Sequence, residues 1–369
     1  MTTQEFEFGL DSFGEVSSES SGRLLSDAET VRLMMDEAAL AEAVGIHSYN
    51  IGEHYRPGHV DSAGHVILAA IAGRTERIRL GTSVTVLSTQ DPVRLYTQFA
   101  TLDAASNGRA QMVVGRASTT DSFPLFGFDL ADYETLFEEK LDLLTRLMRD
   151  QPVTWSGAVR AALTEQQVHP SIAPDSIPIW VGVGGTPQSV IRAARYRLPL
   201  MLAIIGGPLR RFAPYVELYK RALDQFGHPP LPVGVHSLGL VARTDDEARS
   251  AYWPQYRAAF EAVAHERGFT PPTARQFEAE VGDGALFVGS PETVAAKIAA
   301  SIRTLSLSRF DLKYDIGHLS REHRAASIEL YGREVIPQVR ELLAAGRPAV
   351  QPIPSDQRVA EAKKAGSHA

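Results

Sequence analysis

The feature that most constrains the fold of this sequence is a regular alternation of short apolar segments with longer segments of helical periodicity. Eight segments have the character of β-strands, and helical segments lie between them. Each connection is long enough for a helix to cross back over the sheet, so successive strands can run parallel. The expected strands are 6–13, 47–54, 78–87, 110–118, 177–183, 198–206, 233–242 and 309–317, and the main expected helices are 27–44, 63–77, 91–106, 133–148, 208–226, 244–265, 290–305 and 321–344, with a further helix after residue 186.

The number of strands favours a closed barrel. Eight parallel strands surrounded by helices form the (β/α)8 TIM barrel of the α/β class. We expect this fold here, with loop insertions at 119–131, at 151–176, which has the pattern of a small hairpin, and at 266–290, which looks irregular. A doubly wound open sheet is the alternative. We expect one domain over residues 1–345, followed by a disordered C-terminal tail over 346–369.

Charge and composition exclude several classes of protein. The formal net charge is −7 and no cluster of lysines and arginines offsets it, so we expect no nucleic-acid partner. The chain has no cysteine, which excludes disulfides, thiolate metal sites and cysteine nucleophiles. No stretch approaches the roughly 20 apolar residues of a membrane span, and the first residues lack the features of a secretory signal. These observations favour a cytoplasmic protein without a membrane partner.

The segment IPIWVGVGGTPQS (177–189) has the pattern of an anion-binding turn. An apolar strand ends in glycines, and a threonine and a proline then open a helix. Thr186 is the expected N-cap residue. The helix N-terminus, the hydroxyls of Thr186 and Ser189, and the missing Cβ atoms of Gly184 and Gly185 would together favour a phosphate. An ordinary strand-to-helix turn is the alternative, and the glycine spacing does not match the dinucleotide fingerprint G-x-G-x-x-G.

A barrel places its chemistry at the C-terminal ends of the strands. Arg116 ends the fourth strand, and its guanidinium is suited to phosphate oxygens. The fifth strand is its neighbour and leads to Thr186 and Ser189, so we expect these residues to lie close together. An ion pair of Arg116 with Glu53 or Asp121 is the alternative. Other polar residues at strand ends are Asp11, Ser12, His54, Ser83, Thr85, Ser118, His236, Tyr314 and Asp315.

His54, at the end of the second strand, is the expected acid–base residue, because imidazole titrates near neutral pH. A hydrogen-bonded histidine without a catalytic role is the alternative. We expect no metal site from His54, His59, Asp61 and His65, since most of these positions lie in a loop. The sequence has no G-x-S-x-G, P-loop or H-E-x-x-H motif, so hydrolase and NTPase functions have no motif to support them.

Four segments carry a resemblance to a known family. They are GEHY (52–55), residues 81–118, residues 178–207 and GSPETVAAKIAASI (289–302). In content and order these segments resemble the bacterial-luciferase-like flavin-dependent monooxygenases, collinearly from about residue 6 to residue 340. The second segment is the most specific of the four. The resemblance implies a (β/α)8 barrel with FMN at its C-terminal mouth, or with the deazaflavin F420 in one branch of the family.

The resemblance also implies a set of cofactor-binding residues. Arg116 matches the arginine that binds the FMN phosphate, and Thr186 and Ser189 match the hydroxyl pair that binds the same group. Ser83 and Val84 fall where the family often has a non-proline cis peptide beneath the flavin ring. The expected cofactor-binding residues are therefore Ser83, Val84, Gly115, Arg116, Ala117, Gly184, Gly185, Thr186 and Ser189.

The resemblance has departures that bear on function. His54 matches the family's active-site histidine, but Tyr55 replaces the histidine that follows it, and Gly115 replaces luciferase's reactive cysteine. Light emission from a long-chain aldehyde is therefore not expected. The implied function is an FMN-dependent monooxygenase, in which reduced FMN and O2 form a peroxyflavin that oxygenates a small organic substrate. The implied partners are that substrate, a flavin reductase and a second copy of the chain in a homodimer.

Three other functions remain open for a barrel of this kind. An F420-dependent hydride-transfer oxidoreductase would favour basic residues along the groove, and the sequence has few there. A non-catalytic flavin-binding protein would keep the phosphate-binding residues and lose the function of His54. An unrelated sugar-phosphate aldolase would need a strand-end lysine, and Lys313 is the one lysine near such an end.

Overall fold

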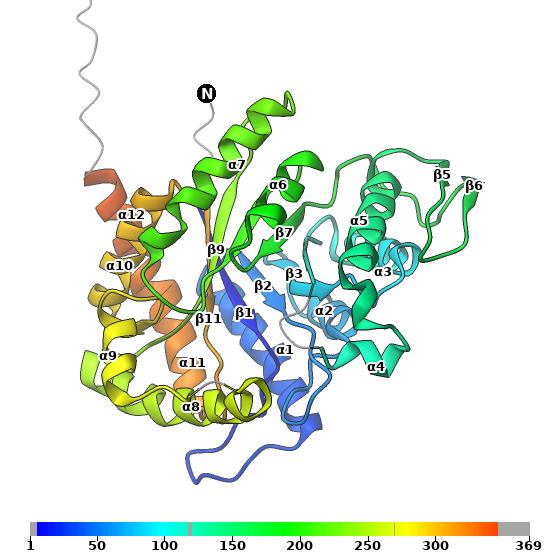
Figure 1. Cartoon of the computed structure of the whole chain (residues 1–369). Helices are drawn as coiled ribbons and strands as arrows, with labels where there is room; N and C mark the ends of the chain where they lie inside the picture. The colour runs from blue at the N-terminus through cyan, green and yellow to red at the C-terminus, as the bar shows by residue number, and fades with distance from the viewer. Residues whose placement is uncertain (1–5, 117–119, 269, 346–369) are drawn as a thin grey trace, which may run out of the picture.

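Eight parallel strands close into a barrel (Figure 1). The computed structural model describes residues 6–116, 120–268 and 270–345. Each barrel strand pairs with the next one along the chain, and the ring closes where β11 pairs with β1. The predicted (β/α)8 barrel is confirmed, and the open sheet is wrong. The barrel strands are β1 (Glu7–Ser12), β2 (Ser48–Ile51), β3 (Arg79–Val86), β4 (Met112–Gly115), β7 (Ile179–Val183), β8 (Leu200–Ala203), β9 (Val233–Val241) and β11 (Arg309–Lys313).

Helices surround the barrel and begin where the sequence places capping residues. The Asp91 carboxylate accepts hydrogen bonds from the N–H groups of Val93 and Arg94, and the Ser290 hydroxyl accepts one from Thr293. The expected helix over 321–344 is interrupted by a π-helical turn, Tyr331–Val335. The helices around the barrel are α1 (Asp27–Ala43), α2 (Gly64–Ala72), α3 (Pro92–Ser106), α5 (Tyr133–Arg149), α6 (Pro187–Arg195), α7 (Ala213–Gln225), α8 (Asp245–Arg267), α10 (Pro291–Leu305), α11 (Arg321–Leu330) and α12 (Ile336–Ala345).

The insertion at 266–290 is more regular than we expected from the sequence. It contains helix α9 (Ala274–Gly282) and strand β10 (Phe287–Gly289), which pairs with β9. Thr273 and Gln276 form a capping box at the start of α9, a signal that the sequence carries. Phe277 and Val281 of α9 join a second core cluster with α8. The expectation of an irregular segment is therefore wrong.

The other insertions contain short elements. Residues 119–131 include helix α4 (Ser122–Phe126). The predicted hairpin is confirmed, because β5 (Val153–Trp155) and β6 (Leu163–Gln166) pair antiparallel. In Figure 1 this hairpin projects beside α5, at the edge of the molecule.

Part of the inside of the barrel is polar. Arg309 and Asp311 of β11 form a buried ion pair, with Nη2 and Oδ2 at 2.7 Å. Glycines on adjacent strands make room for polar side chains: a Cβ on Gly9 would lie 2.3 Å from Asp311 Oδ1, and one on Gly81 would lie 2.5 Å from Asn50 Oδ1. The apolar core lies mainly between the strands and the surrounding helices.

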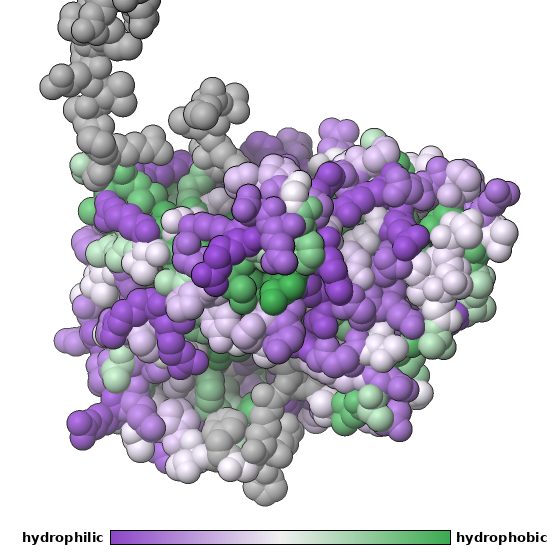
Figure 2. Space-filling view, turned by 45° about the horizontal axis from the view of Figure 1, so that its top comes forward, coloured by the Kyte–Doolittle hydropathy of each residue, from purple (hydrophilic) through white to green (hydrophobic). Residues whose placement is uncertain are grey.

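The C-terminal ends of the strands form one mouth. In Figure 1 it lies at the lower end, where α4, α8, α9 and the loop between β1 and α1 also lie. Figure 2 turns the upper end of the molecule toward the viewer and the mouth away, and the face that it shows is mainly hydrophilic, with a small hydrophobic patch near its centre. Within the described ranges, no helix is both long and apolar enough to cross a membrane. The predicted tail over 346–369 lies outside the described residues.

Candidate functional site

Arg116, Thr186 and Ser189 meet at the mouth. Arg116 directly follows β4, which pairs with β7, and β7 leads into α6. Arg116 Nη2 donates a hydrogen bond to Ser189 Oγ at 2.9 Å, and Thr186 Oγ1 donates one to the same oxygen at 2.8 Å. The structure therefore brings together three residues that the sequence assigned to one site.

The second terminal nitrogen of Arg116 has an acidic partner. Nη1 forms an ion pair with Glu134 in the first turn of α5, and the ring centroid of Tyr133 lies 5.2 Å from the guanidinium carbon. The alternative pairing with Glu53 or Asp121 is therefore wrong. Both contacts are on the side of Arg116 that faces α5, whereas Ser189 is on α6.

The N-terminus of α6 leaves donors available. Thr186 occupies the N-cap position, as predicted, but its hydroxyl bonds to Ser189 Oγ and makes no capping bond to a backbone N–H. In the described part of the chain, no protein acceptor is bonded to the backbone N–H of Gly185, Thr186 or Gln188. Gly185 has a φ of 113°, and a Cβ on Gly184 would meet nothing within 4 Å. A positively polarised helix end with free N–H groups and open space fits an anion such as a phosphate.

A non-proline cis peptide joins Ser83 to Val84 in β3, as the resemblance implied. Two glycines accommodate Val84. A Cβ on Gly115 would lie 2.7 Å from Val84 Cγ2, and a Cβ on Gly182 would lie 2.9 Å from Cγ1. Gly115 immediately precedes Arg116, so this contact links the cis peptide to the arginine. Ala117, another predicted cofactor-binding residue, lies outside the described residues.

His54 is anchored by Asp61. The distance from His54 Nδ1 to Asp61 Oδ2 is 2.8 Å, and the His54 backbone N–H donates to Oδ1 at 3.2 Å. Asp61 is fully buried, and the sequence offered it only as a possible metal ligand. The His59 ring lies 4.8 Å from the His54 ring, centroid to centroid. Burial, with a smaller effect from His54, lowers the pKa of the His59 imidazole.

His65, the fourth of the residues from which we expected no metal site, lies apart from the His54 cluster. His65 Nε2 lies 3.0 Å from the side-chain amide of Gln98. Among residues 6–116, 120–268 and 270–345, no group of three or more His, Asp or Glu side chains is arranged to hold a metal ion.

Glu53 fixes the segment around His54. Its carboxylate accepts hydrogen bonds from the Val86 N–H at 2.8 Å, the Gln90 amide at 2.8 Å and the Tyr55 hydroxyl at 2.6 Å. Burial raises the pKa of Glu53, although these hydrogen bonds oppose the shift. The Tyr55 ring packs edge-on against Phe126 of α4, with 5.0 Å between centroids. Glu53 therefore ties the end of β2 to the end of β3.

A second histidine belongs to the same mouth. His236 Nδ1 is hydrogen-bonded to Asp11 Oδ2, and Ser83 Oγ donates to that oxygen at 2.7 Å. The Phe13 ring is stacked on His236, with centroids 5.5 Å apart, and its centroid lies 4.8 Å from that of His54. The sequence placed Asp11 and His236 at strand ends but gave them no role. Alternation along β1 and β9 was the signal that both side chains point into the barrel.

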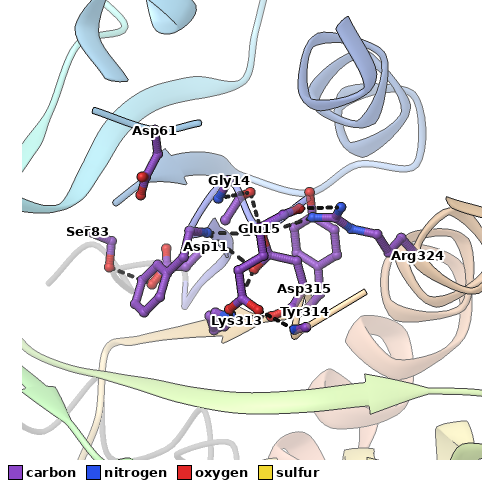
Figure 3. A network of polar contacts seen from close by, with 12 residues as sticks. Asp11, Gly14, Glu15, Asp61, Ser83, Lys313, Tyr314, Asp315 and Arg324 are labelled. Atoms are coloured by element: carbon purple, nitrogen blue, oxygen red, sulfur yellow. Dashed lines mark hydrogen bonds and ion pairs between the residues drawn. The ribbon is translucent and has the colours of Figure 1, made fainter. Parts of the chain in front are cut away.

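A buried charge network holds the loop that carries Phe13. The Asp315 carboxylate accepts hydrogen bonds from Ser12 Oγ at 2.7 Å and from the Phe13 backbone N–H at 3.0 Å. The same carboxylate pairs with Arg324 at 2.9 Å and with Lys313 at 3.3 Å. Figure 3 shows Lys313, Asp315 and Arg324 close together beside Gly14 and Glu15 of this loop, with Arg324 reaching in from its helix. Phe13 is therefore positioned by Asp315, which follows β11 and is itself held by Lys313 of β11 and Arg324 of α11.

Comparison with known proteins identifies the family. A family model described as luciferase-like monooxygenase matches residues 11–308. The chain belongs to the luciferase-like monooxygenase family. One relative in this family, the 4-hydroxyprotoasukamycin monooxygenase of Streptomyces nodosus subsp. asukaensis, is 33% identical over 326 residues, which cover 82% of this chain and 85% of the relative. The resemblance seen in the sequence is confirmed.

Solved structures share the luciferase-like fold. Monooxygenase RslO1 from Streptomyces bottropensis has a TM-score of 0.78 at 24% identity, covering 90% of this chain and 99% of that chain. The oxygenating constituent of 3,6-diketocamphane monooxygenase from Pseudomonas putida, in complex with FMN, has a TM-score of 0.73 at 21% identity, covering 90% and 98%. The coenzyme F420-dependent tetrahydromethanopterin reductase from Methanopyrus kandleri has a TM-score of 0.66 at 19% identity, covering 91% and 99%. The solved structures that share the fold of this chain thus include one in complex with FMN and one described as F420-dependent.

Proposed function

We propose that this chain is an FMN-dependent monooxygenase that oxygenates a small organic substrate with reduced FMN and O2. The observation that carries the proposal is the convergence of Arg116, Thr186 and Ser189 at the N-terminus of α6. A phosphate monoester needs several hydrogen-bond donors and a compensating positive charge. The guanidinium, the two hydroxyls and the free backbone N–H groups supply both.

The residues around this anion site fit the rest of the cofactor. Gly184 leaves space next to the helix end, Gly185 has the positive φ that the turn requires, and Val84 is half-buried at the mouth. Ser83 and Val84 would contact the flavin ring, and Arg116 with its hydroxyl partners would hold the phosphate. Structures of related fold include one in complex with FMN, which supports this choice of cofactor.

His54 is the proposed proton donor or acceptor in this reaction. When bound, reduced FMN supplies two electrons and O2 is the oxidant, so the net reaction yields oxygenated substrate, water and FMN. His54 Nδ1 is bonded to the buried Asp61, so Nε2 is the atom that would donate or accept a proton. Asp61 fixes the orientation of the ring, and Phe13 packs beside it, which limits the access of water.

The proposal also includes partners. The chain lacks the G-x-G-x-x-G fingerprint of dinucleotide-binding folds, so we propose that a separate reductase supplies reduced FMN. The relative named 4-hydroxyprotoasukamycin monooxygenase supports a small organic molecule as the substrate class. We further propose that the chain forms a homodimer, which sedimentation analysis would test.

The test is a titration of the protein with FMN and with riboflavin, which lacks the phosphate. We expect Arg116→Ala to weaken FMN binding by about 10- to 100-fold, since a charge-assisted hydrogen bond contributes roughly 1.5–3 kcal/mol. Riboflavin binding should change little. Arg74→Ala, which removes an exposed arginine paired with Asp36, is the matched control. Equal FMN affinities in the wild type and Arg116→Ala would remove the phosphate assignment.

An F420-dependent oxidoreductase is the second candidate, because structures of related fold use that cofactor. Parallel titrations with FMN and F420 separate the two candidates, and tighter binding of F420 would favour hydride transfer. A non-catalytic flavin-binding protein is distinguished by His54→Ala. If this variant binds FMN normally and oxidises reduced FMN at the wild-type rate, His54 has no part in the chemistry.

A further inference from the structure

The Phe13 ring contacts two histidines that are held in the same way. Its centroid lies 4.8 Å from that of His54 and 5.5 Å from that of His236. Each imidazole has its Nδ1 bonded to a buried carboxylate, Asp61 for His54 and Asp11 for His236. In the part of the chain that the structure describes, neither Nε2 atom is hydrogen-bonded to a protein group. The mouth therefore contains two oriented imidazoles that contact the same aromatic ring.

Asp11 is built to orient His236. Its Oδ2 accepts from both His236 and Ser83, and its Oδ1 accepts from the Asn50 side chain at 2.8 Å. A carboxylate fixed by several donors holds the imidazole with its Nδ1–H inward and its Nε2 lone pair outward. The same carboxylate contacts Ser83, the first residue of the cis peptide at the proposed flavin site. His236 is thus coupled to that site through a single carboxylate oxygen.

We propose that His236 is a second acid–base residue of this mouth and that Asp11 is its positioning residue. The Nε2 atom of His236 would transfer a proton to or from the oxygen that reacts there. The inference rests on the proposed flavin function. In the net reaction, reduced FMN loses two electrons and two protons, and the oxygen atom that does not enter the substrate leaves as water. His236 donates a proton to the leaving oxygen, and the neutral imidazole recovers a proton released by the cofactor.

His236 differs from a histidine that only packs in the core in two respects, the charged groups near it and the hydrogen bonds of its ring nitrogens. The charged groups near it are Asp11 from β1 and the Arg309–Asp311 pair from β11, whose Asp311 is in register with His236. Lys313 lies over the Phe13 ring, at 4.8 Å from its centroid. A histidine that only filled the barrel would need a partner for each of its nitrogens. Within the described residues, His236 has a hydrogen-bond partner on Nδ1 but none on Nε2.

The first test uses the wild-type protein and does not depend on activity. Nitrogen NMR of labelled histidines should show the Nδ1–H tautomer for neutral His236 and His54, and FMN should shift the Nε2 signals of both. His228, in the loop after α7, should not respond and serves as the internal control. If FMN binds but leaves His236 Nε2 unchanged, the inference is wrong while the proposed function stands. If FMN does not bind at all, the proposed function itself fails.

The second test uses variants and the oxidation of bound reduced FMN by O2, in which both oxygen atoms leave as hydrogen peroxide when no organic substrate is present. We expect His236→Gln to slow this oxidation at least 10-fold and to remove one ionisation from its pH profile, with FMN affinity within about 2-fold of wild type. Asp11→Asn should change the tautomer of His236 and reproduce part of the loss. An unchanged pH profile in His236→Gln, with the His228→Gln control also unchanged, would assign His236 a packing role.

Discussion

Arg116 Nη2 and Ser189 Oγ lie 2.9 Å apart, which joins the end of β4 directly to the first turn of α6. The two residues are 73 positions apart in the chain. They meet because β4 and β7 are neighbours in the barrel and both strands end at the same mouth. Ser189 Oγ also accepts a hydrogen bond from Thr186 Oγ1, so removal of the Ser189 hydroxyl removes the hydrogen bonds of both Arg116 and Thr186 to it.

We therefore expect Ser189→Ala to weaken FMN binding by about 5-fold, because a neutral hydrogen bond contributes roughly 1 kcal/mol. Riboflavin affinity should stay within error, since the hydroxyl is proposed to act on the phosphate alone. Fluorescence quenching of each flavin by the protein provides the measurement, and Ser21→Ala, at an exposed position, is the control. A parallel loss of riboflavin binding would show that Ser189 supports the fold of the mouth and not the phosphate.

Glu134 should oppose the binding of FMN. Its carboxylate pairs with Arg116 and, at 2.8 Å, with Arg192, so it competes with a phosphate for the guanidinium of Arg116. Glu134→Gln should tighten FMN binding by about 2- to 5-fold at low ionic strength. The gain should shrink as salt is added, because Glu134 is 63% exposed and its charge is screened. Glu217→Gln, an exposed glutamate of α7, should show no such gain. Weaker FMN binding in Glu134→Gln would mean that Glu134 orients Arg116 and does not compete for it.

The parts of the fold that the sequence predicted are those set by local patterns. Hydrophobic periodicity located the eight strands, and Asp91 and Ser290 marked helix starts that the structure confirms. The meeting of Arg116 with Ser189 also followed from the sequence, because strands adjacent in chain order are adjacent in a barrel.

The residues that the sequence missed depend on contacts across the barrel or between loops. Asp61 reaches His54 through the turn of the loop after β2, and Glu134 reaches Arg116 from a helix whose distance from the end of β4 the periodicity does not fix. The pairing of Asp11 with His236 joins β1 to β9, which lie on either side of β11 but are far apart in the chain. A pattern of local residue types contains no information about such partners, although strand alternation does indicate that both side chains point inward.

Gly115 should not tolerate a side chain. A Cβ at this position would lie 2.7 Å from Cγ2 of Val84 and 3.1 Å from its Cβ, and a β-branched residue cannot rotate away easily. We expect Gly115→Ala to lower the free energy of unfolding by about 1–3 kcal/mol and to weaken the binding of both FMN and riboflavin, since the displaced Val84 belongs to the proposed ring site. Urea denaturation and flavin titration measure the two effects.

The double variant Gly115→Ala/Val84→Ala distinguishes this steric effect from others. Removal of both Val84 methyl groups creates the space that the new Cβ needs, so the double variant should recover part of the flavin affinity lost in Gly115→Ala. If the double variant loses as much flavin affinity as the two single variants lose together, Gly115 is required for a reason other than contact with Val84.

Asp315 should make the free energy of unfolding depend on pH in the acid range. Burial alone would raise the pKa of this carboxyl, but Lys313 and Arg324 outweigh burial and lower it to about 2. Because the folded-state pKa lies below the ordinary value of 3.8, the stabilisation is complete above about pH 4 and is lost as the pH falls toward 2. The free energy of unfolding should therefore decrease by about 2 kcal/mol over that interval, at roughly 1.4 kcal/mol per pKa unit.

Asp315→Asn tests this directly and also probes the mouth. The substitution leaves Lys313 and Arg324 with less compensating charge, so we expect a loss of about 3–5 kcal/mol at pH 7 and a flatter dependence on pH between 4 and 2. Urea denaturation at a series of pH values measures both, with the exposed Asp36→Asn as the control. Since Asp315 also accepts a hydrogen bond from the backbone N–H of Phe13, the variant should loosen the ring that contacts both His54 and His236. The NMR signals of the two imidazoles should then broaden or shift together, and a wild-type spectrum in a destabilised Asp315→Asn protein would show that the network stabilises the fold without positioning the histidines.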